Sequence, residues 1–256
     1  MKTTLFTALA CFAGLTLFAQ TNKVTVLTYN IHHGENLKKE LDLQGIANVI
    51  LATNPDLVAL QEVDSVTQRT QKVDQLKELA SITGMYTYYA KAMDYDGGGY
   101  GTGILSRFPI ENGVTIQLPS AQSGNEPRVA GIVTVKLPSD SLIQFVSTHL
   151  DAGQKPTDRL LQSAALAEHF KATQLPIILA GDLNAIPSAK EINVLRKIFT
   201  DATPQVAPTI PADAPKEKID YIMVHPKHNW TIVSARTIEE SVASDHRPVL
   251  CELELK

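Results

Sequence analysis

The 256-residue chain is 44% hydrophobic and carries a formal net charge of −4. This length and apolar content are enough to bury one sizeable core. No composition shift or low-complexity linker divides the chain, so we expect a single domain over residues 20–256. The acidic balance argues against a strongly basic nucleic-acid or membrane binder. It does not exclude a nuclease, because a few local cations and a bound metal can meet a phosphate.

The first 19 residues are expected to form a secretory signal peptide that is removed. Lys2 gives a positive start, Leu5–Phe18 is apolar, and Ala19 is a suitable cleavage position. The alternative is a membrane anchor, but the apolar run is short and polar residues follow it at once. We therefore expect a secreted or periplasmic protein without a stable membrane anchor. Cleavage leaves Cys251 as the only cysteine, so no internal disulfide is expected.

Strand and helix signals alternate in the first part of the chain. The β-branched run Val24–Ile31 predicts a strand, and the apolar spacing over Leu43–Ile50 predicts a helix. Leu57–Leu60 is the next predicted strand, and Asp74–Ile82 is a second predicted helix. This alternation is typical of a layered α/β unit.

A glycine-rich stretch follows the aromatic strand predicted over Tyr86–Tyr89. Residues 94–101 are expected to be a loop, and five glycines lie in 97–103. They predict either a flexible or tightly turned segment close to a ligand, or a plain hairpin loop. Tyr95 and Tyr100 are candidates to border a substrate, or are ordinary loop aromatics.

The rest of the chain is rich in predicted strands. Helices are expected over Thr157–Lys171 and from a capping Ser188 through Phe199. The succession of strands and helices occurs twice along the chain, which predicts two mixed β-sheets packed face to face, with helices outside. The expected strands are Val114–Leu118, Arg128–Leu137, Leu142–His149, Pro176–Leu179, Ile219–Val224, Trp230–Ser234 and Pro248–Leu255.

The stretch Ala180–Pro187 follows the buried strand predicted at Pro176–Leu179. Gly181 is expected to let the backbone turn sharply, so that Asp182 and Asn184 point out of the carboxyl end of the strand. Open α/β sheets gather their ligands at this edge. The alternative is a capped strand-to-helix turn, because Asp and Asn are common turn residues.

Polar side chains lie at the ends of several predicted strands. Such groups are costly in apolar surroundings unless they are paired, coordinated or hydrogen-bonded, so together they predict a metal-assisted phosphoester site. Their hard oxygen atoms suit Mg²⁺ or Mn²⁺. Zn²⁺ is disfavoured, because the adjacent His32 and His33 would point to opposite faces of an extended run. The strand-end residues are Asn30, Glu62, His149, Asp151, Asp182, Asn184, Asp220, Asp245 and His246.

Five short motifs carry all of these residues except Asp151 and Asp220, and in this order they resemble the motifs of the endonuclease/exonuclease/phosphatase superfamily. The resemblance covers essentially the whole chain after the first 19 residues. It implies an α/β (α+β) four-layer sandwich and a divalent-metal phosphoesterase, as in pancreatic-type deoxyribonuclease and bacterial sphingomyelinases. The motifs are Tyr29-Asn30-Ile31, Leu60-Gln61-Glu62-Val63-Asp64, Ser147-Thr148-His149-Leu150, Gly181-Asp182-Leu183-Asn184 and Ser244-Asp245-His246-Arg247-Pro248.

The resemblance also implies roles for the metal ligands and for the residues that handle protons. Glu62 would be the main ligand of Mg²⁺ or Mn²⁺, helped by Asn30 and by Asp245 or its bound water. His246 would contact the phosphate and assist attack. Asp182 would either position the nucleophilic water or handle the leaving-group proton.

Four further residues are given supporting roles by the same resemblance. Asp220 would orient His246, while Asn184 and His149 would hydrogen-bond the non-bridging phosphate oxygens. Arg128 is placed like a phosphate-clamping arginine, and its alternative is a solvated charge on an edge strand. These assignments agree with general chemistry, because a metal and fixed donors stabilise the charge of a phosphoryl transition state.

One departure from the family pattern concerns His32. Abasic-site enzymes carry an acidic residue at this position, so the resemblance does not imply a second metal there. We expect a monomeric phosphodiesterase acting on a nucleic acid, a lipid headgroup or a small phosphoester. The alternatives are a sphingomyelin- or inositol-phosphate-type phosphatase and, more remotely, a catalytically silent binding module, because function depends on the loops around a shared site.

Overall fold

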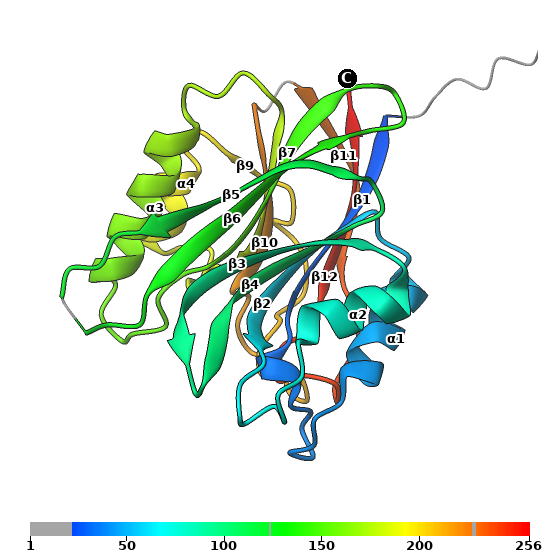
Figure 1. Cartoon of the computed structure of the whole chain (residues 1–256). Helices are drawn as coiled ribbons and strands as arrows, with labels where there is room; N and C mark the ends of the chain where they lie inside the picture. Colours follow the sequence, from blue (N-terminus) through cyan, green and yellow to red (C-terminus); the bar gives the residue numbers. More distant parts are fainter. Residues whose placement is uncertain (1–21, 123, 227–228) are drawn as a thin grey trace, which may run out of the picture.

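The computed structural model describes residues 22–122, 124–226 and 229–256, which form two six-stranded mixed sheets (Figure 1). The first sheet has the order β11 (Trp230–Thr237), β12 (Val249–Leu255), β1 (Lys23–Asn30), β2 (Leu57–Ser65), β4 (Gly98–Ser106), β3 (Tyr86–Tyr95). The second has the order β5 (Ile110–Leu118), β6 (Arg128–Lys136), β7 (Leu142–His149), β8 (Ile177–Asp182), β10 (Asp220–His225), β9 (Thr200–Asp201). The helices are α1 (Leu43–Thr53), α2 (Gln75–Thr83), α3 (Thr157–Phe170) and α4 (Lys190–Leu195), with a 3₁₀ turn, η1 (His32–Gly34).

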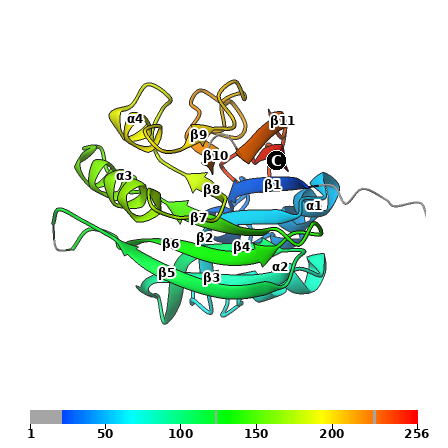
Figure 2. The same ribbon diagram turned by 90° about the horizontal axis from the view of Figure 1, so that it is seen from above.

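The side chains of each central strand alternate between two hydrophobic cores. In β1, Val26 enters the core between the sheets, whereas Leu27 faces the core beneath α1 and α2. In β8, Ile178 faces the inter-sheet core and Leu179 packs with α3 and α4. This two-residue period gives a helix–sheet–sheet–helix sandwich, which Figures 1 and 2 show from two directions. The expected four-layer fold is confirmed.

Among the described helices, α1 and α2 begin with a side-chain cap, whereas α3 and α4 do not. Asp42 and Asp74 cap α1 and α2 by accepting from Gly45 and Lys77 backbone N–H groups. The helix predicted from Ser188 through Phe199 is wrong in extent, because α4 spans only Lys190–Leu195 and has no side-chain cap. The chain leaves this helix to begin β9, which pairs with β10.

The loop expected over residues 94–101 is also wrong, because only Asp96 and Gly97 form the turn between β3 and β4. Both have positive φ, 46° and 75°, as tight hairpin turns require. The glycines that follow lie in β4, and at two of them, Gly98 and Gly101, neighbouring backbone leaves no room for a side chain. A Cβ at Gly101, for example, would lie 2.1 Å from the carbonyl oxygen of Ala90.

Gly181 has a different role from the expected sharp turn. It lies within β8, and a Cβ there would lie 2.0 Å from the carbonyl oxygen of Thr148. Glycine therefore allows β7 and β8 to approach closely, and the turn comes later, at Asn184, whose φ is 49°.

None of the helices in the described ranges is long and apolar enough to cross a membrane. The signal peptide expected over residues 1–19 lies outside those ranges.

Candidate active site

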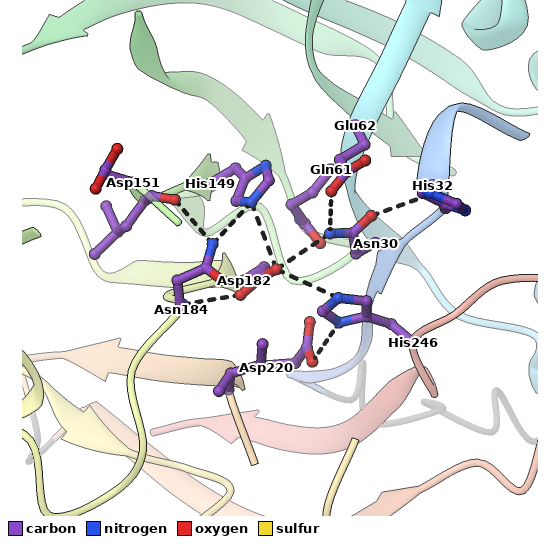
Figure 3. A network of polar contacts seen from close by, with 12 residues as sticks. Asn30, His32, Gln61, Glu62, His149, Asp151, Asp182, Asn184, Asp220 and His246 are labelled. Carbon is purple, nitrogen blue, oxygen red and sulfur yellow. Dashed lines mark hydrogen bonds and ion pairs between the residues drawn. The ribbon is translucent and has the colours of Figure 1, made fainter. Parts of the chain in front are cut away.

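The site lies where the two central parallel strand pairs end. β1 runs parallel to β2, and β7 runs parallel to β8. Asn30, His149 and Asp182 are the last residues of β1, β7 and β8. Because these carboxyl ends share one edge of the sandwich, side chains from both sheets meet there (Figure 3).

The carboxylate of Asp182 is the centre of the polar network in Figure 3. Its Oδ2 accepts from Asn30 Nδ2 at 3.1 Å and lies 3.5 Å from His149 Nε2 and 3.7 Å from His246 Nε2. Its Oδ1 accepts from the Asn184 backbone N–H at 2.8 Å. Burial, reinforced by the charge of Asp220, raises the pKa of Asp182 to about 7. This carboxyl group can therefore exchange a proton near neutral pH.

His246 is oriented by Asp220 from the opposite sheet. Nδ1 of His246, in the loop before β12, lies 3.0 Å from Oδ2 of Asp220 at the start of β10. Burial lowers the pKa of His246, but the charges of Asp220 and Asp182 outweigh this effect and raise the pKa to about 10. His246 is therefore an imidazolium at neutral pH, with its Nε2–H directed towards Asp182.

His149 is buried and neutral. Burial, with the charges of Arg128 and His246, lowers the pKa of His149 well below its usual 6.5. Arg128 Nη1 donates to His149 Nδ1 at 2.9 Å, which leaves the imidazole proton on Nε2. Asn184 Nδ2 lies 3.0 Å from that Nε2 and donates to the Leu150 carbonyl. Arg128 is only 6% exposed, so it is not a solvated charge on an edge strand.

A cleft of about 320 Å³ opens beside this network. It includes Arg69, which nothing in the sequence pattern singled out, because Arg69 reaches the site only through the packing of its loop. Arg69 makes a bidentate pair with Asp64 at 2.7 and 2.8 Å, and its guanidinium lies over the rings of Tyr95 and Tyr100. The cleft is lined by His32, His33, Glu62, Arg69, Met93, Tyr95, Tyr100, Glu126, Arg128, His149 and Ala152.

Glu62 projects into this cleft from an irregular point of β2. The pairing of β2 with β4 shifts between Leu60 and Val63, and Glu62 has a φ of 56°. Bulges of this kind re-aim a side chain at functional edges. One carboxylate oxygen, Oε1, accepts from Asn30 Nδ2 at 3.0 Å, and Asn30 Oδ1 accepts from the His32 N–H.

Two groups of acidic and histidine side chains in the described residues bring their ligand atoms within 4.8 Å of one another. One comprises His32, His33 and Glu62, and the other comprises the buried Asp182, Asp220 and His246. The imidazolium of His246 is a poor metal ligand, so the group around Glu62 fits a divalent cation better. Asp245 belongs to neither group, and its role as a ligand stays a prediction.

The expectation that His32 and His33 face opposite ways is wrong. These residues form a 3₁₀ turn rather than an extended run, and both have a φ of 45°. Their ring centroids lie only 4.4 Å apart in an edge-to-face arrangement.

The strand-end residue Asp151 accepts from the Gly153 N–H and stabilises its own loop.

Sequence and structure comparisons agree with this fold and arrangement. The endonuclease/exonuclease/phosphatase family model matches residues 27–246, so the chain belongs to that family. It is 27% identical over 248 residues to the protein YbhP of Escherichia coli K12, covering 90% of this chain and 96% of YbhP. Members of this family are divalent-metal-dependent phosphoester hydrolases.

Two solved structures illustrate the likeness. An endonuclease/exonuclease/phosphatase from Beutenbergia cavernae superposes with a TM-score of 0.78 at 24% identity, covering 91% of this chain and 72% of that one. The mannosyl-6-phosphatase Bt3783 of Bacteroides thetaiotaomicron superposes with a TM-score of 0.72 at 18% identity, covering 90% of this chain and 99% of that one. At these identities the likeness concerns the fold.

Proposed function

We propose that this chain is an exported, divalent-metal-dependent phosphodiesterase. The observation that carries the proposal is the position of the Asp182 carboxylate, held by Asn30 and flanked by His246 and by His149, which lines the cleft. A carboxylate with a pKa near 7 beside a fixed imidazolium suits attack by water on a phosphoester. These groups supply a base and a cation within one polar network.

In the proposed reaction, Asp182 is the general base and His246 is a cationic hydrogen-bond donor. Asp182 takes a proton from water as the new P–O bond forms and the bond to the leaving oxygen breaks in line. The leaving oxygen takes its proton from solvent. His246 cannot act as the base because it already carries its proton. The raised pKa of His246 supports this choice between the two residues.

The remaining donors surround the non-bridging oxygens in this proposal. Arg128 donates to His149, and Asn184 donates to the Leu150 carbonyl beside it, so the positions of these donors are fixed before substrate binds. Preorganised donors of this kind stabilise the charge that grows on the phosphoryl group. Glu62, with Asn30, would hold the cation, and Asp245 would take part through a water. When bound, the cation neutralises phosphate charge and polarises the P–O bond.

A phosphomonoesterase acting on a small molecule is the second candidate. The cleft volume of about 320 Å³ suits a small ligand, and Arg69 lies over the two tyrosines of its wall. One structural neighbour is a mannosyl-6-phosphatase, which adds support for a sugar phosphate.

The test is hydrolysis of bis-p-nitrophenyl phosphate, p-nitrophenyl phosphate, plasmid DNA and sphingomyelin in parallel, with Mg²⁺ or Mn²⁺ and with a chelator. Chelator-sensitive cleavage of the diesters supports the main proposal. Cleavage of the monoester alone supports the second candidate. No cleavage of any substrate contradicts both and favours a binding module.

Export and a monomeric state are parts of the same proposal. The apolar run Leu5–Phe18 followed by Ala19 supports export. N-terminal sequencing of protein recovered from the periplasm or medium should give a chain that starts near Gln20. Retention of the intact chain in the cytoplasm would contradict this, and light scattering would reveal any stable oligomer.

A further inference from the structure

Two histidines and one glutamate come together at the mouth of the cleft from different parts of the chain. His32 and His33 follow β1, whereas Glu62 lies at the β2 bulge. Their ligand atoms all lie within 4.8 Å of one another. Figure 3 shows His32 and Glu62 both close to Asn30, with His32 on the opposite side of that residue from His149. The three groups therefore face one small volume that opens to the cleft.

Each of the two imidazoles has a nitrogen atom that can bind a ligand. Within the described part of the chain, Nδ1 of His32 and Nδ1 of His33 are both buried without a hydrogen-bond partner. The carboxylate nearest to His33 Nε2, that of Glu35, lies 3.9 Å away and is engaged by Lys39 at 2.9 Å. Buried polar atoms are normally paired, so two adjacent exceptions require an explanation.

The backbone holds all three residues in a costly conformation. His32, His33 and Glu62 all have φ in the left-handed region, at 45°, 45° and 56°. Hydrogen bonds fix the turn, since the Gln75 side chain donates to the His33 carbonyl and Asn30 Oδ1 accepts from the His32 N–H. Strain of this kind persists where the surrounding structure imposes it, and it clusters at functional sites.

Two imidazole nitrogens and one carboxylate oxygen form a donor set of borderline softness. Mg²⁺ prefers oxygen ligands, whereas imidazole favours transition-metal cations. The neighbouring Arg69 is no obstacle, because Asp64 compensates its charge through two hydrogen bonds. We propose that His32, His33 and Glu62 form a binding site for a divalent transition-metal cation such as Co²⁺ or Zn²⁺, in preference to Mg²⁺. This proposal rests on the metal-dependent function and specifies the ion that its centre selects.

The experiment measures metal binding without substrate. Metal-free protein is titrated with Co²⁺ and with Mg²⁺ by calorimetry, and the visible absorption of Co²⁺ reports its ligands. The test variant is His32→Asn with His33→Asn, because Asn tolerates the left-handed backbone and replaces nitrogen ligands by oxygen. His169→Asn is the matched control, since His169 is exposed on α3.

We expect the unaltered protein to bind Co²⁺ at least about tenfold more tightly than Mg²⁺. The double variant should lose at least about tenfold in Co²⁺ affinity and change its absorption, with little change in Mg²⁺ affinity. The control should match the unaltered protein. Equal affinities for the two ions, or unchanged Co²⁺ binding by a folded double variant, would overturn the proposal. Thermal unfolding without metal verifies that the double variant is folded, and the single variant His33→Asn replaces it if it is not.

The outcome is independent of the hydrolysis assay. Chelator-sensitive hydrolysis without a Co²⁺ preference would reject this inference and leave the proposed function in place. Selective Co²⁺ binding by a protein that hydrolyses no phosphoester would reject the proposed function and leave the metal site in place.

Discussion

His246 Nδ1 lies 3.0 Å from Asp220 Oδ2, and this contact joins the two sheets of the sandwich. Asp220 begins β10 in the second sheet, whereas His246 precedes β12 in the first. The pair therefore forms only when the sheets pack against each other. It fixes the imidazole with Nε2 directed at Asp182, so the ionisation of these groups depends on the assembled fold.

The first prediction concerns the pH dependence of hydrolysis. Asp182 must lose its proton to act as a base, so kcat/KM should rise as pH increases through about 7. His246 must keep its proton, so kcat/KM should fall as pH increases through about 10. The result is a bell-shaped profile, measured with bis-p-nitrophenyl phosphate at constant metal concentration. If kcat/KM decreased as pH rose from about 7 to about 10, the assignment of Asp182 as the base and His246 as the cation would be contradicted.

The second prediction is that Asp182→Asn removes most of the activity. The amide has a similar shape but cannot accept the proton of the attacking water, so kcat should fall by about a hundredfold to ten-thousandfold. Asp213→Asn changes an exposed carboxylate and serves as the control. Circular dichroism verifies the fold of both variants. A near-normal rate in folded Asp182→Asn would remove Asp182 from the proposed mechanism.

The third prediction concerns Glu62. Glu62→Ala should lower metal-dependent kcat/KM by about a hundredfold or more, because a bound metal contributes several kcal/mol to phosphoryl transfer. The variant should remain folded, since Glu62 is only partly buried and lies on the wall of the cleft. Glu254→Ala, at an exposed position of β12, is the control. Full metal-dependent activity in Glu62→Ala would exclude Glu62 as a required ligand.

The fourth prediction concerns Lys218, whose side chain is only 6% exposed. Burial lowers the pKa of Lys218 from 10.5 to about 8, although Asp201 lies 3.8 Å away and opposes this effect. Between about pH 8 and pH 10.5, Lys218 is protonated in the unfolded chain but not in the folded protein. The free energy of unfolding should therefore rise with pH over this range. At pH values below the pKa of Lys218 in the folded protein, the buried charge of Lys218 destabilises the protein by up to about 3 kcal/mol.

Lys218→Met removes this cost while keeping most of the side-chain volume. The variant should therefore be more stable than the unaltered protein near neutral pH, and the difference should shrink as pH rises from about 8 towards about 10. Urea denaturation at several pH values measures both quantities. Lys216→Met, which changes an exposed lysine, is the control. A difference that is independent of pH would show that the Lys218 charge is not its cause.

Several features of the site could be predicted from sequence because they depend on neighbours along the chain. The strand before Asp182, the caps of α1 and α2, and the alternation of β1 follow from local patterns. The ordered motifs around Asn30, Glu62 and His246 predicted the fold and the reaction class, and the family match confirms the fold. The roles of the individual residues stay predictions.

Other features required the tertiary structure. The glycines of β4 predicted a loop, but two of them, Gly98 and Gly101, are needed where backbone segments touch. Arg69 gave no signal in the sequence, because the packing of its loop places it over Tyr95 and Tyr100. His32 and His33 were expected to diverge, and a tight turn brings their rings together.

Apart from the start of β4 and the extent of α4, the sequence by itself determined the main strands and helices and the polar residues that end the strands, since both depend on the spacing of side chains along a few residues. The tertiary structure decided which of those residues meet, how Asp182 and His246 ionise, and which side chains gather around Glu62. These properties depend on distances between the two sheets and on burial, which no local pattern contains.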